Sequence, residues 1–445
     1  MNDQHSPQPE HAGDHIDPAI WRGLTQRRVS RRNVLRSAGA GAGALGAGAF
    51  LAACGVKGAT VANHNTQSSN GPGSPAWWAK QQLHHTVNFG NWPYYIDVLS
   101  GKHPSLEHFT QTTGIKVNYT EPISDNLPFY AKIRPSLQAK QYTGYDIIVM
   151  TNNSPPLGYL IDYGWLTPLD QGAMPNFHKY AGPLIKNPSW DRGNKYTMAW
   201  QSGWTAIGYN SSAIPHPGNS VDILFDRKYA GKVGMMADPQ ELGSLGLLAI
   251  GVEPATSTES EWAKAAKKLQ QQKSDGIVRA YYDQDYINHL KNGDTLVTQA
   301  WSGDIFQADL NSKYNDLQLL IPHQGGMFWT DNMCIPMYAQ NPKDAMMLMD
   351  YYYNPDVQAV VEYYNDYVCP VPAAQEALLH PTGWAKQTLK AMGPSIGLPT
   401  SVTAHAGTVF PTATDIQNSR PYYQYKSQEE LTAWNNLFLP ITQGS

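Results

Sequence analysis

The feature that most constrains this chain is a regular alternation of short apolar runs with stretches of helical spacing. Residues 86–150 show it most clearly. The apolar runs are Thr86–Phe89, Ile115–Tyr119 and Tyr145–Met150, and the helical stretches are His103–Thr113 and Tyr130–Ala139. Strand, helix, strand, helix, strand with short links is typical of a doubly wound parallel sheet in an α/β protein. Ligands of such sheets bind beyond the carboxyl ends of the strands, so we expect a binding site there.

A second unit with a similar pattern begins after residues 205–210. Its expected strands and helices are Lys232–Met236, Leu242–Ile250, Glu259–Gln272, Thr295–Trp301, Leu317–Pro322, Ala345–Tyr353 and Pro355–Tyr364. The length of 445 residues predicts two or three domains at roughly 100–200 residues each. No long apolar segment follows residue 54, so we expect no membrane-spanning helix in that part of the chain.

Composition narrows the functional class. Hydrophobic residues make up 41% and charged residues 15%, which suits a folded chain rather than a disordered one. A formal net charge of −4 without a long Lys/Arg block argues against nucleic-acid binding, which needs an electropositive face. The 26 Tyr and 13 Trp outnumber the 10 Phe. Tyr and Trp suit a wet binding cleft as well as a core, so these counts alone do not decide between the two.

The N-terminus has the layout of an export signal. Two arginine pairs within residues 27–32 precede a Gly/Ala-rich apolar stretch, as in secretory signals of the twin-arginine class. Residues 51–54 (LAAC) resemble a bacterial lipobox, whose cysteine is acylated after cleavage and supplies a membrane anchor. We therefore expect a signal peptide over residues 1–53, lipidation at Cys54 and a flexible, lipidated tether over residues 54–83. The apolar stretch is too short and too rich in glycine for a transmembrane anchor helix.

Cleavage before Cys54 changes the charge and leaves two cysteines. It removes six basic and four acidic residues, which takes the formal net charge from −4 to −6. A mildly acidic exported protein favours cationic ligands over anionic ones. Cys334 and Cys369 lack metal-ligand spacing. They either pair in an oxidising compartment or remain buried free thiols among apolar neighbours, and their surroundings favour the second interpretation.

Six segments share their order and spacing with one protein family. They are Asn91–Ile96 (NWPYYI), Phe109–Tyr119 (FTQTTGIKVNY), Gly144–Val149 (GYDIIV), Trp204–Asn210 (WTAIGYN), Trp301–Asp304 (WSGD) and Gly325–Pro336 (GGMFWTDNMCIP). Together they resemble the spermidine/putrescine-binding proteins of bacterial polyamine ABC importers. The resemblance runs from about residue 84 to the C-terminus, and it rests on the set of segments rather than on one motif.

The resemblance implies a type II periplasmic-binding-protein fold. Such a fold has two discontinuous lobes joined by a hinge, and one ligand lies in the central cleft between them. The chain is then expected to cross near Gly203–Gly208 and to return near Gly325–Asp331. The expected parts are residues 84–204 and 331–390 for lobe 1, and residues 205–330 and 391–445 for lobe 2.

The chemistry of a polyamine indicates which side chains its site needs. A buried ammonium group without a partner costs several kcal/mol, so the cleft must supply carboxylates. Aromatic faces along the methylene stem add cation–π attraction of about 0.5–2 kcal/mol each. The sequence places both kinds of group at short spacing in the pairs Trp301/Asp304 and Trp329/Asp331.

Further candidates follow from position and from the resemblance. Asp238 and Glu241 lie three residues apart at a strand-to-helix junction, so they can face the same space. Trp92 and Tyr95 follow the first expected strand. The candidate ligand-binding residues are Trp92, Tyr95, Thr151, Asp238, Glu241, Trp301, Asp304, Trp329, Asp331 and Tyr367.

Several candidates also have a purely structural interpretation. Trp301 ends a hydrophobic strand and suits a core, and Asp304 suits a cap of the following turn. Asp238 suits the N-cap of the next helix. Trp329 and Asp331 lie in a glycine-rich return segment, which favours a cleft over a core.

The chain departs from the family pattern at two places. After Asn91-Trp92 the family often has Thr or Ser and then an acidic residue, where this chain has Pro93 and Tyr94. After the third strand the family has a hydroxyl residue followed by an aromatic one, and Thr151-Asn152-Asn153 keeps only the hydroxyl. Tyr367 resembles a late ligand-contacting tyrosine. These departures bear on which amine is bound.

The sequence thus predicts an extracytoplasmic, membrane-anchored lipoprotein that captures a polyamine of the putrescine/spermidine class and delivers it to an ABC permease. The motifs H-E-x-x-H, the P-loop and C-x-x-C are absent from the sequence, so we expect no enzyme. The alternatives are another solute in the same fold (another cation, an iron complex or a sugar), a carboxylate-based hydrolase, or a sensor or structural lipoprotein. We expect a monomer whose partners are the amine, the permease subunits and the membrane, with no nucleic acid, metal or cofactor.

Overall fold

The computed structural model describes residues 70–93, 95–124, 126–283, 285–309, 314–396 and 409–443. The expected signal peptide, Cys54 and most of the tether therefore lie outside the described residues. Within the described part of the chain, no helix is both long and apolar enough to cross a membrane.

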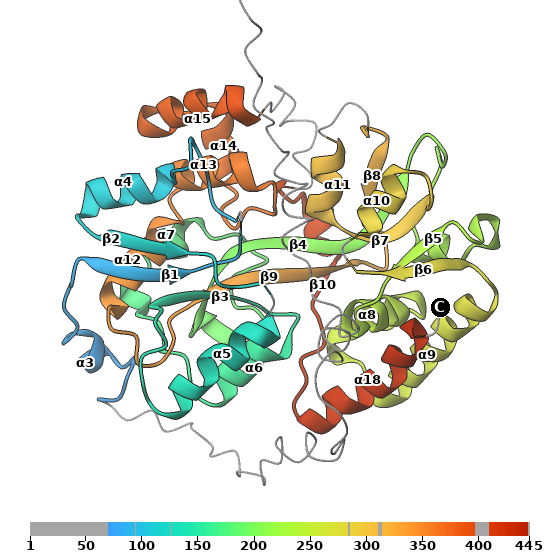
Figure 1. The fold of residues 1–445 in the computed structure, drawn as a ribbon, viewed down its shortest axis with the longest axis horizontal. Helices are drawn as coiled ribbons and strands as arrows, with labels where there is room; N and C mark the ends of the chain where they lie inside the picture. The colour runs from blue at the N-terminus through green and yellow to red at the C-terminus, as the bar shows by residue number, and fades with distance from the viewer. Residues whose placement is uncertain are drawn as a thin grey trace, which may run out of the picture.

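A mixed sheet of ten strands runs across the middle of the described molecule (Figure 1). The strands are β1 (Thr86–Gly90), β2 (Lys116–Thr120), β3 (Ile147–Thr151), β4 (Thr197–Asn210), β5 (Val233–Met236), β6 (Val278–Tyr282), β7 (Val297–Trp301), β8 (Leu317–Leu320), β9 (Gly326–Cys334) and β10 (Ser419–Arg420). Their order is β2-β1-β3-β9-β4-β7-β5-β6, with β8 paired to β4 and β10 paired to β9. β1–β3 form one parallel group and β5–β7 another. The antiparallel strands β4 and β9 join the two groups.

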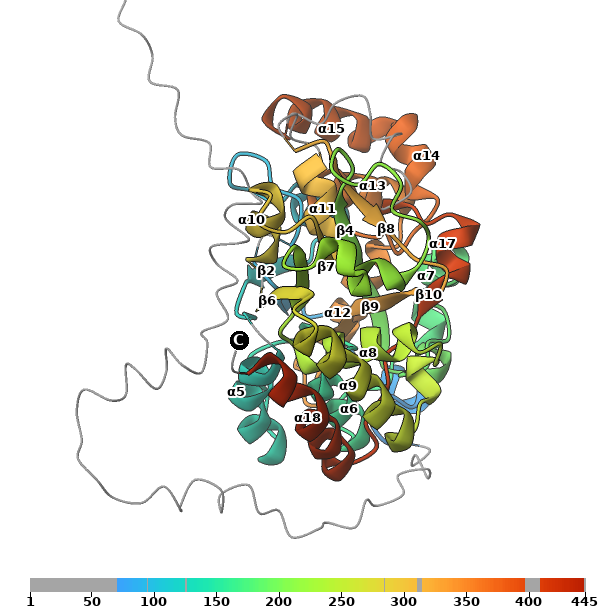
Figure 2. The ribbon, with the colours of Figure 1, turned by 90° about the vertical axis from the view of Figure 1, so that its right-hand side faces the viewer.

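Helices cover both faces of this sheet (Figures 1 and 2). They are α3 (Pro75–Trp78), α4 (Pro104–Thr113), α5 (Asn126–Gln138), α6 (Pro155–Asp162), α7 (Pro175–Tyr180), α8 (Pro239–Ala249), α9 (Glu259–Ser274), α10 (Tyr286–Lys291), α11 (Ser302–Asp309), α12 (Pro342–Tyr351), α13 (Pro355–Asn365), α14 (Ala374–Leu379), α15 (Gly383–Ile396), α17 (Ala413–Gln417) and α18 (Gln428–Thr442). Below the sheet in Figure 1, α5 and α6 cover the half with β1–β3, and α8, α9 and α18 cover the half with β5–β7.

The predicted alternation over residues 86–150 is confirmed, because β1, α4, β2, α5 and β3 follow one another there. The later predicted strands and helices correspond to β5, α8, α9, β7, β8, α12 and α13. The pattern missed β6, an edge strand whose residues are mostly half-buried. It also missed α10, α11 and α18.

β4 and β9 are the two segments that connect the halves of the sheet. β4 pairs with β9 from Thr197 to Thr205 and with β7 from Thr205 to Tyr209. All of β9 and the first twelve residues of β4 are buried. A strand buried on both faces shows no alternation of polar and apolar residues, so the sequence pattern did not predict β4 as a strand.

Most of the core falls into two large hydrophobic clusters. The first surrounds β1–β3 and includes Phe89 and Trp200, and the second includes Trp262 and Trp434 between α9 and α18. The lobe boundaries predicted at 204/205 and 330/331 fall inside β4 and β9, and the one at 390/391 falls inside α15. α15 packs on α13. These residue boundaries of the two lobes stay a prediction.

Candidate ligand-binding site

A cavity of about 530 Å³ lies between the loops that follow β1 and β3 and the elements α8, α11 and α18. Its lining includes all ten candidate residues: Trp92, Tyr95, Thr151, Asp238, Glu241, Trp301, Asp304, Trp329, Asp331 and Tyr367. The fold thus brings together residues that are spread over more than half of the chain. That they contact a ligand stays a prediction.

Asp331 is held by hydroxyl groups from the side of β1 and β3. Its Oδ2 accepts a hydrogen bond of 2.7 Å from the Tyr95 hydroxyl, and its Oδ1 accepts one of 2.5 Å from Thr151. Asn126 fixes Thr151 in turn, because its amide donates to Thr151 Oγ1 over 3.0 Å. Burial raises the pKa of Asp331 to about 6, against which both hydrogen bonds act. Near neutral pH this carboxylate is therefore charged but readily protonated.

Glu241 and Asp238 lie at the start of α8. Asp238 is the N-cap of that helix, since its Oδ1 accepts hydrogen bonds from the backbone amides of Gln240 and Glu241 over 2.9 and 3.0 Å. The structural interpretation of Asp238 is thus confirmed, and the same side chain also lines the cavity. Glu241 is buried, and its two oxygens accept hydrogen bonds from Asn153 over 3.2 Å and from Tyr422 over 2.8 Å.

Trp301 and Asp304 lie where β7 ends and α11 begins. Both are half-buried and line the cavity, so Trp301 is not a fully buried core residue. Asp304 lies in the first turn of α11, and that it caps this turn stays a prediction. Its Oδ2 accepts a hydrogen bond of 2.6 Å from the hydroxyl of Tyr286. Tyr286 also contacts the Trp301 ring edge-to-face, with ring centroids 5.7 Å apart.

Trp329 belongs to the cavity wall and to the core at the same time. It is only 8% exposed and packs within the second hydrophobic cluster, yet it lines the cavity. A Cβ at Gly203 would overlap its indole ring, so the ring lies directly on β4. Tyr367 packs edge-to-face against Trp329 and against Tyr95, at centroid distances of 5.7 and 5.2 Å. Cleft and core are therefore not exclusive alternatives for Trp329, because the residue belongs to both.

Several lining residues were missed by the sequence reasoning. Four of them, Leu431, Asn435, Leu439 and Gln443, recur every four residues along α18 and the residue after it. This spacing places them on one helix face, so a signal for them was present in the sequence. Asn153 was noted only for its lack of an aromatic ring, yet its amide reaches Glu241 across the cavity.

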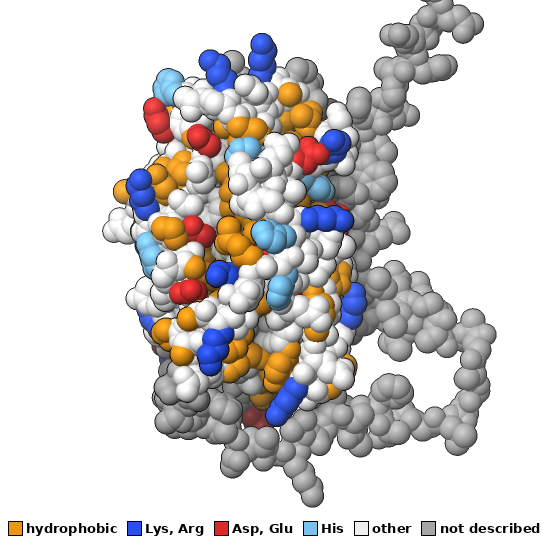
Figure 3. Space-filling model, turned by 90° about the vertical axis from the view of Figure 1, so that its left-hand side faces the viewer, with side chains coloured by type: hydrophobic (Ala, Val, Ile, Leu, Met, Phe, Trp, Pro, Cys, Tyr) orange, Lys and Arg blue, Asp and Glu red, His pale blue; other side chains and the backbone are white. Residues whose placement is uncertain are grey.

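The cavity has a single sign of charge. Four carboxylates line it, and none of its described lining residues is Lys, Arg or His. The outer face beside β2 differs, because positive and negative side chains are interspersed there (Figure 3). A partly enclosed acidic site concentrates the field of its carboxylates, and such a site attracts cations.

Two other expectations concern metals and cysteines. Among the described residues, no group of three or more His, Cys, Asp or Glu side chains is arranged to hold a metal ion. Cys334 and Cys369 are both free and buried, as favoured by their apolar sequence neighbours. Burial raises the pKa of both thiols well above the ordinary value of 9.0.

Comparison with known proteins assigns the chain to a family. The family model described as bacterial extracellular solute-binding protein matches residues 105–391, more than half of the chain. The chain belongs to this family. Its members are transport proteins that bind a solute outside the cytoplasm, which confirms the extracytoplasmic, solute-binding class predicted from the sequence.

Individual relatives agree with the resemblance seen in the sequence. The spermidine/putrescine-binding periplasmic protein of Salmonella typhimurium is 29% identical over 299 residues, covering 66% of this chain and 80% of the relative. A putrescine-binding periplasmic protein of Pseudomonas aeruginosa is 29% identical over 336 residues, covering 70% and 86%. The solved spermidine/putrescine ABC transporter substrate-binding protein of Streptococcus pneumoniae shares the fold, with a TM-score of 0.65 at 22% identity. The match covers 80% of this chain and 98% of the Streptococcus protein. The expected two-lobed fold is thereby confirmed.

Proposed function

We propose that this protein captures a linear polyamine of the putrescine/spermidine class in the cavity and delivers it to the permease of an ABC importer. The observation that carries the proposal is the charge of the cavity, which has four carboxylates and, among its described lining residues, no basic side chain. A neutral solute such as a sugar does not need four carboxylates. Relatives whose names state spermidine or putrescine binding support the same ligand class.

The carboxylates and the aromatic rings of the cavity have different roles. In this proposal the ammonium groups pair with Asp238, Glu241, Asp304 and Asp331, which removes the cost of burying an unpaired cation. The rings of Trp92, Trp301, Trp329 and Tyr367 cover the methylene stem and add cation–π attraction where an ammonium group lies over a ring face. Exclusion of water on closure strengthens each of these charge interactions.

Closure needs two bodies that move relative to each other. We take them as residues 84–204 with 331–390 and residues 205–330 with 391–445, with the hinge on β4 and β9. Three hydrogen bonds between these parts support a closed arrangement. They are Asn153 to Glu241 at 3.2 Å, Tyr159 to Gln428 at 3.0 Å and Gln424 to Asn152 at 3.3 Å. The proposal describes binding and transfer without a catalytic step, by a monomer that carries no cofactor.

A calorimetric screen of the purified chain from Cys54 onward tests the proposal. Putrescine, spermidine, spermine and agmatine are titrated, with 1,4-butanediol as a control of putrescine's length that carries no charge. We expect saturable binding of at least one amine and no binding of the diol. Absence of binding for all four amines, or turnover of a sugar substrate, would contradict the proposal.

The lipid anchor is a separate part of the proposal. We propose that Cys54 is acylated after cleavage of residues 1–53 and that the acyl chains hold the protein at the membrane, because residues 51–54 (LAAC) resemble a lipobox. Cys54→Ala is then expected to release the protein from the membrane fraction after a carbonate wash. The tether variant Lys57→Ala serves as control and stays bound, and retention of Cys54→Ala in the membrane would contradict the anchor.

A further inference from the structure

Three of the four carboxylates in the cavity accept a hydrogen bond from a buried tyrosine. The pairs are Tyr95 with Asp331 at 2.7 Å, Tyr422 with Glu241 at 2.8 Å and Tyr286 with Asp304 at 2.6 Å. Tyr95 is itself part of the cavity wall. Tyr286 and Tyr422 are fully buried behind the wall and do not line the cavity.

Tyr422 links Glu241 to the connecting strand β4. Its hydroxyl lies 2.8 Å from Glu241 Oε2 and 3.1 Å from Thr205 Oγ1. The hydroxyl has one hydrogen, so it donates to the carboxylate and accepts from Thr205. Burial and the charge of Glu241 raise the pKa of Tyr422 well above its ordinary value, so the phenol stays protonated and remains a donor. Consecutive hydrogen bonds of this kind strengthen one another.

Tyr286 fixes both members of the Trp301/Asp304 pair. Its hydroxyl accepts a hydrogen bond of 3.0 Å from the Trp301 backbone amide and donates to Asp304. The phenol ring also packs edge-to-face on the Trp301 indole. One buried side chain therefore sets the orientation of an aromatic ring and of a carboxylate that lie side by side in the cavity.

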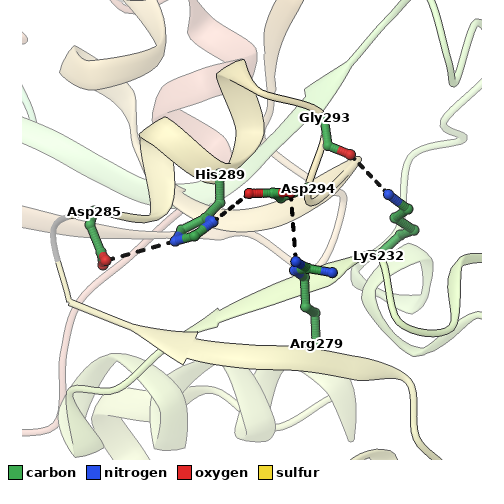
Figure 4. Close-up of polar contacts among 6 residues, drawn as sticks. All are labelled: Lys232, Arg279, Asp285, His289, Gly293 and Asp294. Carbon is green, nitrogen blue, oxygen red and sulfur yellow. Dashed lines mark hydrogen bonds and ion pairs between the residues drawn. The ribbon is translucent and has the colours of Figure 1, made fainter.

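The helix that carries Tyr286 is itself fastened to the sheet (Figure 4). His289 of α10 lies between Asp294, at 2.9 Å, and Asp285, at 3.8 Å. Asp294 in turn lies 3.6 Å from Arg279 of β6. The His289 ring also stacks on Tyr282, at a centroid distance of 4.4 Å. α10 is thus tied to β6 through His289, which contacts Asp294 and stacks on Tyr282.

We propose that Tyr286 and Tyr422 are positioning residues for cation binding, acting through Asp304 and Glu241. A phenol holds a carboxylate in place without cancelling its charge, whereas Arg or Lys at the same position would neutralise it. The ligand then meets carboxylates that are already oriented and still negative, so less freedom is lost on binding. This inference rests on the proposed function.

A double-mutant cycle separates positioning from a general structural role. Amine affinity is measured by calorimetry for the parent, Tyr422→Phe, Glu241→Gln and the double variant. We expect Tyr422→Phe to weaken binding about tenfold, or about 1.4 kcal/mol, in the parent. In the Glu241→Gln background it should cost less than twofold, because the charge that Tyr422 orients is gone. The pair Tyr286→Phe and Asp304→Asn is treated in the same way.

Matched variants guard against effects on folding. Tyr353→Phe removes an equally buried hydroxyl, which donates to the Ala199 carbonyl over 2.7 Å outside the cavity, and should leave affinity unchanged. Thr205→Val removes the donor to Tyr422 and keeps the side-chain shape, so it reports on the same chain of hydrogen bonds if Tyr422→Phe fails to fold. We expect about a twofold loss of affinity for Thr205→Val.

The outcomes distinguish this inference from the proposed function. Equal costs of Tyr422→Phe in both backgrounds, or no cost in the parent, would overturn the positioning role while amine binding stands. If the parent binds none of the four amines, the proposed function fails and this inference fails with it.

Discussion

The carboxylates of the cavity are supported in two different ways. Asp331 lies within β9, where the hydroxyls of Tyr95 and Thr151 hydrogen-bond to its carboxylate. Glu241 lies in the first turn of α8, three residues after the N-cap Asp238. The dipole of a helix favours a negative charge in its first turn, and a strand offers no comparable field.

This difference assigns different roles to the two groups. Without a helix terminus, burial dominates at Asp331 and raises its pKa to about 6, close to neutral pH. We therefore expect Asp331 to set the pH response of binding. Glu241 and Asp238 supply charge from the other side of the cavity, where the helix terminus favours it.

The largest expected effect comes from removing the charge of Asp331. Asp331→Asn should weaken amine binding about 100-fold, because the ammonium group opposite it then lies buried without its partner. Glu241→Gln should have an effect of similar size. Calorimetry measures both, with the exposed Asp222→Asn as control. An unchanged dissociation constant in either cavity variant would remove that residue from the site.

Asp331→Asn should also change the stability of the ligand-free protein. The folded-state pKa of Asp331 lies above its ordinary value of 3.8, so the fold favours the protonated form. Ionisation of Asp331 thus lowers stability as the pH rises from about 4 to 6, by up to about 3 kcal/mol. Asp331→Asn removes this cost and should raise the melting temperature at pH 7 while it weakens amine binding. A lower melting temperature would contradict the unfavourable burial of this charge.

Trp329 sharpens the comparison, because it lies on β9 two residues before Asp331 and serves both cavity and core. Trp329→Leu should weaken amine binding about tenfold through the lost ring face. It should also cost about 3 kcal/mol of folding stability, since the indole packs on Gly203 and Tyr367. Thermal melts and titrations of one preparation measure both effects. Loss of only one of the two would assign Trp329 to the cavity alone or to the core alone.

The smallest expected effect is the pH dependence of binding. With a pKa of about 6, Asp331 becomes largely protonated between pH 7 and 5.5, and amine affinity should fall about fourfold. Glu241→Gln should keep this dependence, and Asp331→Asn should lose it. Titrations at both pH values check the difference, and the same fall in affinity in Asp331→Asn would place the titrating group elsewhere.

The sequence indicated the residues that line the cavity better than it indicated the tyrosines that hydrogen-bond to its carboxylates. All ten candidate residues line one cavity. They could be predicted because motif order and aromatic–carboxylate spacing are visible along the chain. Tyr422 and Glu241 are 181 residues apart, and Tyr95 and Asp331 are 236 apart. No local pattern marks such partners. The face of α18 was different, since its spacing of four residues was visible and was not used.

What the sequence by itself determined is the part that depends on local order. The alternation of apolar runs specified the strands and helices of the first unit, and the short spacing within Trp301/Asp304 and Trp329/Asp331 specified aromatic–carboxylate pairs. Only the tertiary structure decided which tyrosine holds which carboxylate, that Asp238 both caps α8 and lines the cavity, and that Trp329 serves core and cavity together. These outcomes depend on how strands far apart in sequence pair across β4 and β9, and burial and hydrogen bonding are fixed only once that pairing exists.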